Sequence, residues 1–266
     1  FVERIYDNCN ILRMSKLICE SIKHFVSPLI GEFPQELIKE FELGNEFRFT
    51  PIGTVTKIRF YDRYFLATAK HCAKLLTERY PRIFYDLSYE LEHPLFAKFI
   101  PILEQIELES KDNEETKDVT FYEINKKDAL WLQNEKEVKN FFFDASLNCL
   151  NTSSISALIS SCDSCGFIYG YPIDNIDDEN KRFKINQQLI PVRNIHSSKL
   201  SPLYLEYDLD LPDVSYNDRL DGMSGGVLMC QDPQDMFHLY PIAMHIQGSN
   251  SIGHAIITPL LLKDLI

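Results

Sequence analysis

The sequence contains no apolar run close to the ~18–20 residues that an α-helix needs to cross a bilayer. It also lacks clusters of lysine and arginine: 27 basic residues stand against 39 acidic ones, for a net charge of −12 at pH 7. Because binding to phosphates and anionic lipids depends on clustered positive charge, we expect neither a nucleic-acid partner nor a membrane partner. The acidic residues gather in 104–118 and 174–179, which we expect to be solvated loops of a soluble globular protein.

The number of cysteines is odd, seven, and the N-terminus carries no signal-peptide pattern. This combination favours a reducing compartment, so we expect a cytoplasmic protein with free thiols. Cys162 and Cys165 form a lone C-x-x-C pair, which predicts no metal site because a second pair of ligands is missing. No cofactor is implied. Residue 1 is Phe rather than Met, and we expect the chain to be a piece or a processed product of something larger.

Two short motifs carry the chemistry of the sequence. Residues 221–226 read Asp-Gly-Met-Ser-Gly-Gly, and residues 68–72 read Thr-Ala-Lys-His-Cys. A serine hydroxyl is a weak nucleophile at neutral pH and needs a neighbouring base, for which His71 is the candidate. Attack also needs donors for the oxyanion that forms, and glycines around Ser224 let the backbone turn sharply and present the amides of Gly222 and Ser224. The two motifs therefore indicate a nucleophilic serine assisted by a histidine.

In this order the motifs resemble the TAAHC and GDSGG signatures of the trypsin-like (chymotrypsin-fold) serine peptidases. The resemblance implies an all-β fold of two six-stranded antiparallel β-barrels and a serine endopeptidase that cleaves a protein or peptide substrate. It covers about residues 47–266 and is specific only around His71 and Ser224. A catalytically silent module that keeps the same fold to bind peptides is an alternative.

A second alternative is an esterase of the α/β-hydrolase class. Gly222-x-Ser224-x-Gly226 fits the nucleophile elbow of that class, in which a helix follows the serine. Here the apolar runs 227–230 and 239–244 flank a turn at 232–233, which predicts strand, turn and strand. This pattern disfavours the esterase.

The chain is expected to contain three segments. Residues 1–46 have apolar positions at spacings of three and four, with proline opening 34–41, which predicts a helical N-terminal extension and a candidate docking element for a regulatory protein. Residues 47–155 are expected to form the first barrel, with a hairpin of 54–60 and 64–68 that leads to His71. Residues 156–266 are expected to form the second barrel. There, 166–172 resembles the GYP strand of intracellular bacterial members, 173–182 is expected to be a loop, and 204–209 a strand.

The resemblance also implies an acid that orients His71. Asp118 opens residues 118–124, which match the family's DIAVLKL-type strand of an acid followed by interleaved apolar residues. Asp128 opens a similar stretch inside an expected helix, and Asp144 is a third candidate. We favour Asp118 and keep the other two open.

Residues 244–255 resemble the GMHVGGNGSHGFA segment of picornavirus-type processing proteases. This likeness implies that His245 lines the S1 pocket and reads glutamine or glutamate, with Gly248 also in contact with the substrate. A buried, hydrogen-bonded strand histidine is the alternative for His245. Asp218 offers a rival S1 determinant, because it precedes Ser224 by six residues, where trypsin-like enzymes selective for Arg or Lys carry their aspartate.

Two departures from the family bear on regulation. Met223 replaces the aspartate that pairs with a newly cut N-terminus in digestive and clotting proteases, which argues against activation by that route. Cys72 has no cysteine in 54–57, near where secreted relatives carry its disulfide partner. The resemblance therefore suggests a bacterial intracellular protease, acting as a defence or regulatory effector that a partner switches on.

Overall fold

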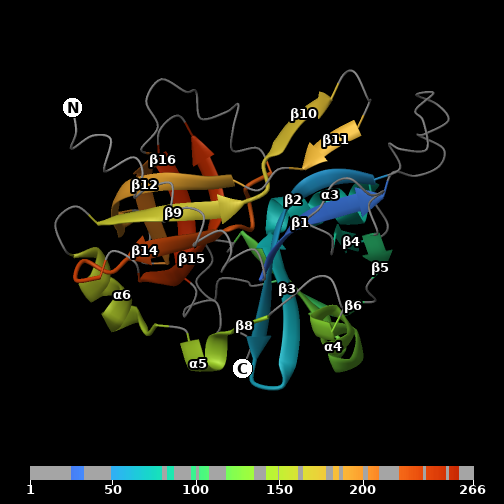
Figure 1. The fold of residues 1–266 in the computed structure, drawn as a ribbon, viewed down its shortest axis with the longest axis horizontal. Coiled ribbons are helices and arrows are strands. Elements are labelled where there is room, and N and C mark those ends of the chain that lie inside the picture. The colour runs from blue at the N-terminus through green and yellow to red at the C-terminus, as the bar shows by residue number, and fades with distance from the viewer. Residues whose placement is uncertain are drawn as a thin grey trace.

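The computed structural model describes residues 25–32, 49–79, 83–86, 97–99, 102–107, 118–134, 142–148, 150–160, 164–177, 182–185, 188–199, 203–209, 222–235, 238–249 and 252–257. These residues are mostly β-strand, arranged as two main antiparallel sheets with a few short helices (Figure 1). None of the described helices is long and apolar enough to cross a membrane.

The N-terminal half forms one sheet around a central hairpin. The hairpin strands β2 (Phe49–Phe60) and β3 (Arg63–Ala69) are rich in β-branched and aromatic residues, which favour strands. In the described part of the chain the strand order is β5-β4-β1-β2-β3-β7-β6, and β8 pairs in parallel with β2. The other strands are β1 (Val26–Glu32), β4 (Ile83–Asp86), β5 (Ala97–Phe99), β6 (Ile102–Glu107), β7 (Val119–Ile124) and β8 (Phe143–Asp144). The helices are α3 (Lys70–Arg79), α4 (Lys126–Asn134) and α5 (Ala145–Asn148).

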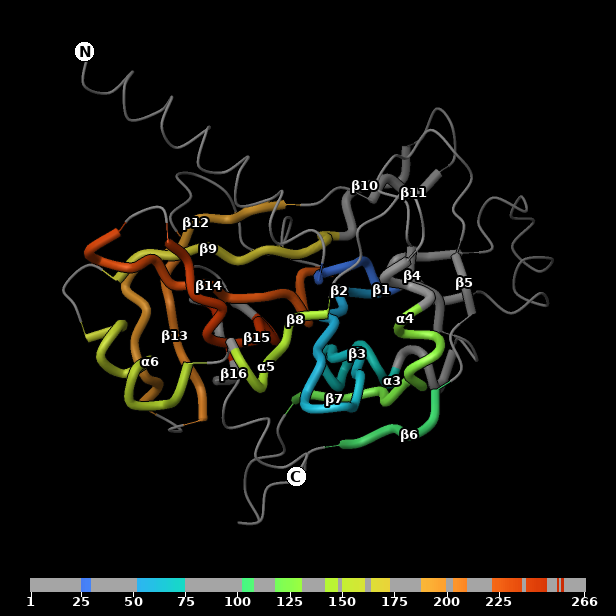
Figure 2. The backbone as a smooth tube through the Cα atoms, turned by 60° about the horizontal axis from the view of Figure 1, so that its bottom comes forward, coloured from blue at the N-terminus to red at the C-terminus, as the bar shows by residue number. Residues whose placement is uncertain are grey.

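The C-terminal half is a closed six-stranded barrel with the order β12-β13-β16-β15-β14-β9. Its strands are β9 (Cys165–Gly170), β12 (Gln188–Ser197), β13 (Tyr204–Leu209), β14 (Val227–Gln231), β15 (Leu239–Ser249) and β16 (Ile252–Ile257). Helix α6 (Thr152–Ile159) precedes the barrel, and β10 (Ile173–Asp177) with β11 (Arg182–Ile185) forms a separate hairpin. The barrel lies beside the N-terminal sheet, on the left of Figure 2.

Apolar side chains form three clusters. One fills the N-terminal half around Val55 and Leu66, and one fills the barrel around Ile168 and Leu228. The third joins the two halves, because Met244 and Ile246 of β15 pack with residues of the N-terminal sheet. Those residues are Ile58, Phe60, Phe65, Ala67, Val119 and Phe121, and Ala145 of α5 joins the same cluster. The two halves therefore meet along a buried apolar face, with β2 and β15 on either side of it.

The strand predictions made from local pattern are confirmed at β2, β3, β7, β9, β13, β14 and β15. The expectation of a helix over 1–46 is wrong for residues 26–32, which form β1. Pro28 disfavours a helix here because it lacks the amide hydrogen. A strand tolerates it because Pro28 pairs with β2 only and lies outside Leu29–Gly31, the part of β1 that pairs with strands on both sides. The helix expected for 34–41 lies outside the described residues.

Three further elements differ from expectation. The N-terminal sheet has eight strands and is not closed on itself within the described residues, because β4 and β5 extend an edge that the sequence left unassigned. Residues 104–107 of the acidic stretch belong to the edge strand β6. This strand is exposed along nearly its whole length, so it has no buried face to create an alternating pattern. Of the loop expected at 173–182, residues 173–177 form β10 and Arg182 begins β11, which pairs with β10.

One charged residue lies within the N-terminal core. Lys57 in β2 is fully buried, and its Nζ donates to Ser27 Oγ at 2.9 Å. Burial lowers the pKa of Lys57 to about 7, because the interior disfavours the ammonium form. Between this value and the ordinary ~10.4, the unfolded chain binds more protons than the folded one, so the contribution of Lys57 to stability rises with pH across that window.

We therefore predict that Lys57→Met raises the free energy of unfolding by roughly 1–3 kcal/mol below about pH 7, and that the gain shrinks as the pH approaches ~10. Chemical denaturation over this pH range measures the effect. Lys126→Met is the matched control, because Lys126 is exposed on α4 and its loss should change stability by no more than about 0.5 kcal/mol. A pH-independent loss of stability in Lys57→Met would contradict the prediction.

Candidate functional site

Strand pairing brings His71 and Asp118 together. β3 and β7 are antiparallel with Ala69 opposite Val119, so the chain leaving β3 lies beside the chain entering β7. His71, the second residue of α3, donates its backbone amide to Asp118 Oδ1 at 3.0 Å, and its ring Nδ1 lies 2.7 Å from Asp118 Oδ2. The Lys70 amide donates to the Asp118 carbonyl at 3.2 Å. Both carboxylate oxygens therefore contact His71 and fix its ring.

The carboxylate also favours the charged form of the ring. The hydrogen bond with Asp118 is the largest cause that raises the pKa of His71, and the Cys72 side chain adds to it, while partial burial opposes it. Because Nδ1 is held by the carboxylate, Nε2 is the nitrogen that can exchange a proton with another group. The His71 side chain is 47 % exposed and is therefore accessible from solvent.

The two rival acids have other partners. Asp128 lies in the first turn of α4, where its amide donates to Asn125 Oδ1 at 2.8 Å and its carboxylate accepts from the Asn125 side chain. Asp144 accepts from the amide and the hydroxyl of Ser146 at the start of α5, and it forms an ion pair with Arg59 at 3.7 Å. Asp144 caps the start of α5, Asp128 is held by the Asn125 side chain, and Asp118 is the acid that contacts His71.

The segment 222–226, here called the serine turn, precedes β14. Gly222 and Gly225 have positive φ angles of 89° and 94°, which glycine adopts without strain. A Cβ on Gly225 would stand 2.0 Å from the Thr54 carbonyl oxygen, and one on Gly226 would stand 2.4 Å from the Tyr169 carbonyl oxygen. Side chains at 225 and 226 are therefore excluded by contact with β2 and β9.

All five carbonyls of the serine turn accept a hydrogen bond. The donors in chain order are Thr54 Oγ1 to Gly222 (2.7 Å), the Gly226 amide to Met223 (2.9 Å), the Thr54 amide to Ser224 (2.9 Å), Thr56 Oγ1 to Gly225 (2.7 Å) and the His245 amide to Gly226 (2.8 Å). Among the described residues, the amides of Gly222, Met223 and Ser224 donate to no protein acceptor. A turn with held carbonyls and unused amides is suited to bind an anion or a polarised carbonyl oxygen.

Gly53 in β2 lies between the two motifs. A Cβ at Gly53 would stand 2.8 Å from Cys72 Sγ and 3.3 Å from the Ser224 carbonyl oxygen. Glycine therefore lets the neighbour of His71 and the backbone of Ser224 approach the same point of β2. Within the described residues, the Ser224 hydroxyl and the His71 ring form no hydrogen bond with each other.

His245 lies in the barrel interior behind the serine turn. It is 1 % exposed, and its Nδ1 forms a hydrogen bond with the Tyr207 hydroxyl. Its backbone exchanges hydrogen bonds with the turn, because its carbonyl accepts from Gly225 and its amide donates to Gly226, both at 2.8 Å. The buried, hydrogen-bonded position that the sequence kept as an alternative is the one observed.

The remaining residues singled out from the sequence fall in different places. Met223 is fully buried in the barrel core, next to Gly170. Gly248 lies in β15 opposite Gly253, and Asp218 lies outside the described residues. Thr54, Thr56 and Tyr207 also belong to the site and were not predicted from the sequence. Each is one of many β-branched or aromatic strand residues, so nothing in the pattern distinguishes it.

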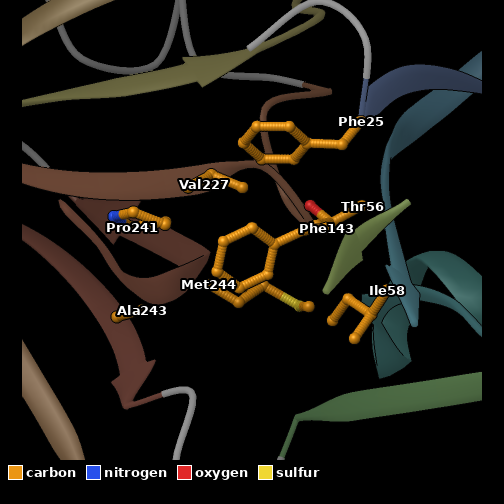
Figure 3. A pocket seen from close by; sticks show the side chains of 8 residues that line it. All are labelled: Phe25, Thr56, Ile58, Phe143, Val227, Pro241, Ala243 and Met244. Atoms are coloured by element: carbon orange, nitrogen blue, oxygen red, sulfur yellow. The ribbon is translucent and has the colours of Figure 1, made fainter. Parts of the chain in front are cut away.

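A small apolar pocket lies between the two halves, beside the serine turn (Figure 3). The rings of Phe25 and Phe143 stand 5.6 Å apart in its wall. The hydroxyl of Thr56, which also lines it, already donates to Gly225. The rest of the lining is Ile58, Val227, Pro241, Ala243 and Met244. The pocket can hold apolar groups, but its wall holds neither His71 nor Ser224.

No protein-family model matches this sequence, and no curated protein matches it either. Within the described ranges, no three His, Cys, Asp or Glu side chains gather where they could hold a metal ion. His71, Asp118 and the serine turn therefore make up the candidate site.

We predict that Asp118→Asn lowers the pKa of His71 toward its ordinary value of ~6.5, because the carboxylate that stabilises the imidazolium is removed. NMR titration of the histidine rings measures this directly and needs no substrate. Asp128→Asn removes the same chemical group from a helix N-terminus and should leave the His71 pKa unchanged. Equal shifts in the two variants would contradict the assignment of Asp118 as the partner.

Proposed function

We propose that the protein is a serine endopeptidase of the two-barrel chymotrypsin type. Ser224 is the nucleophile, His71 the base, and Asp118 the acid that orients His71, while the amides of Gly222 and Ser224 form the oxyanion hole. One observation carries the proposal: Cys72, the neighbour of the hydrogen-bonded His71–Asp118 pair, and the backbone of Ser224, in a turn whose amides are unused among the described residues, both approach Gly53 of β2.

The reaction follows from these roles. Ser224 Oγ attacks the scissile carbonyl carbon, and its proton passes to His71 Nε2. The substrate oxygen becomes an oxyanion that the two amides stabilise. His71 then gives the proton to the leaving amine, the peptide bond breaks, and an acyl-serine ester remains. Water, deprotonated by His71, hydrolyses the ester and restores the Ser224 hydroxyl. Asp118 assists both transfers because it stabilises the imidazolium.

The position opposite Cys72 is a glycine, which supports the proposal of a reducing environment. Gly53 of β2 faces the Cys72 sulfur, 2.8 Å from where a Cβ would stand, so no cysteine at this position can form a disulfide with Cys72. Among the described cysteines, Cys72 and Cys230 are buried and form no disulfide. We propose a cytoplasmic bacterial enzyme that acts on a protein or peptide substrate. A partner switches it on, in keeping with a defence or regulatory role.

We predict that Ser224→Ala abolishes labelling by a fluorophosphonate probe, because the nucleophilic oxygen is removed. Thermal stability should change by no more than about 1 kcal/mol, since one hydroxyl without a hydrogen-bond partner is lost. Ser153→Ala, on the exposed surface of α6, is the matched control and should label like the unmodified protein. In-gel fluorescence and a thermal melt give the two readouts.

Labelling that persists in Ser224→Ala would overturn Ser224 as the nucleophile. A folded but unlabelled parent protein would instead favour the silent peptide-binding module. The observation that favours the peptide-binding module is that, among the described residues, Ser224 and His71 form no hydrogen bond with each other. Catalytic hydrogen bonds of this kind are often long before substrate binds, so the protease remains our proposal.

We further predict a preference for glutamine or glutamate at P1. This preference rests on the resemblance of residues 244–255 and on the backbone hydrogen bonds that join His245 to the serine turn; the ring itself is 1 % exposed, and its Nδ1 contacts the Tyr207 hydroxyl. Profiling of a peptide library should show this preference, and Tyr207→Phe should weaken it. A preference for Arg or Lys that is lost in Asp218→Asn and kept in His245→Ala would assign specificity to Asp218 instead.

A further inference from the structure

The hydroxyl of Thr54 connects three distant parts of the chain. Thr54 lies in β2 and is fully buried. Its Oγ1 lies 2.7 Å from the Gly222 carbonyl oxygen in the serine turn and 2.9 Å from the Tyr171 amide nitrogen, which follows β9. Its backbone amide donates to the Ser224 carbonyl at 2.9 Å. One residue of the N-terminal half thus contacts two peptide groups of the serine turn.

The direction of the hydroxyl's hydrogen bonds follows from its partners. The Tyr171 amide can only donate, so Thr54 Oγ1 accepts there. The single hydroxyl hydrogen is then available for the Gly222 carbonyl, which can only accept. The Tyr171 amide therefore orients the hydroxyl, and the hydroxyl in turn fixes the peptide plane between Gly222 and Met223.

This contact matters because Gly222 has little to hold it otherwise. At φ 89° it has no side chain to restrict rotation of the adjoining peptide groups. Its amide donates to no acceptor among the described residues, so its carbonyl makes its only hydrogen bond there, to Thr54. The direction of the Gly222 amide relative to this carbonyl depends on the φ and ψ angles of Gly222.

We propose that Thr54 is a positioning residue that orients the oxyanion-binding amides through the carbonyl of Gly222. The inference rests on the proposed function. Thr54 touches neither substrate nor His71; it acts through the serine turn. A β-branched residue suits this task, because its χ1 angle is restricted and the hydroxyl is held ready.

The first test is the rate of fluorophosphonate labelling. Thr54→Val should lower the maximal rate ~10- to 100-fold, less than the ~10²–10³-fold expected when an oxyanion donor is lost outright. The half-saturating probe concentration should stay unchanged, since the leaving-group and binding contacts are retained. Thr54→Ser keeps the hydroxyl and should restore most of the rate.

Thr120→Val is the matched control. Thr120 is equally buried in the same sheet, but its hydroxyl has no hydrogen-bond partner, so the same substitution should leave labelling unchanged. Labelling of Thr54→Val at the parent rate overturns the role of Thr54 while Ser224 stays the nucleophile. A parent protein that does not label overturns the proposed function instead.

The second test does not need activity. In the Ser224→Ala background, Thr54→Val should shift the NMR amide signals of Gly222 and Met223 and speed their hydrogen exchange, whereas Thr54→Ser should not. The His71 pKa should be the same in all three proteins, which separates a local reorientation from general loosening. Unchanged turn amides in Thr54→Val would overturn the inference whether or not the protein is an enzyme.

Discussion

The contact between the backbone of β2 and the serine turn is the constraint on which the site depends. At Gly225 the two chains are so close that a Cβ would stand 2.0 Å from the Thr54 carbonyl oxygen. The same carbonyl accepts from Thr68 Oγ1 at 2.8 Å, in the strand that leads to His71. Glycine at 225 therefore has a structural reason beyond chain flexibility: any side chain would separate the serine from the sheet that carries the histidine.

Each half contributes one part of the chemistry. The N-terminal sheet holds His71 and Asp118, whose alignment needs only the pairing of β3 with β7. The barrel holds the serine turn, but the donors for three of its five carbonyls are Thr54 and Thr56 of the other half. The conformation of the turn thus depends on hydrogen bonds from both halves of the molecule.

The elements that could be predicted are those specified by neighbouring residues. The hairpin before His71, the strand after Asp118 and the glycine pattern around Ser224 have short-range signatures, and the described elements follow them. The strand at Val26–Glu32 could not be predicted, because its apolar spacing suits a helix and its strand form comes from pairing with β2 and β4. Asp118 and Asp128 have similar local sequences, and only the fold shows which one meets His71. Thr54 had no signature, since its role depends on residues far along the chain.

The burial of Met223 bears on how an oxyanion hole at this turn would be ordered. In the proteases that the motifs resemble, an aspartate at this position pairs with a newly formed N-terminus, and that ion pair orders the oxyanion hole. Here the side chain at 223 lies in the barrel core, where an unpaired charge would be strongly unfavourable. The turn is ordered instead by hydrogen bonds from β2, which need no cleavage of the chain. Because the contacts of β2 set the geometry of the serine turn, and the apolar face joins β2 to the barrel, a change at either place would alter the turn.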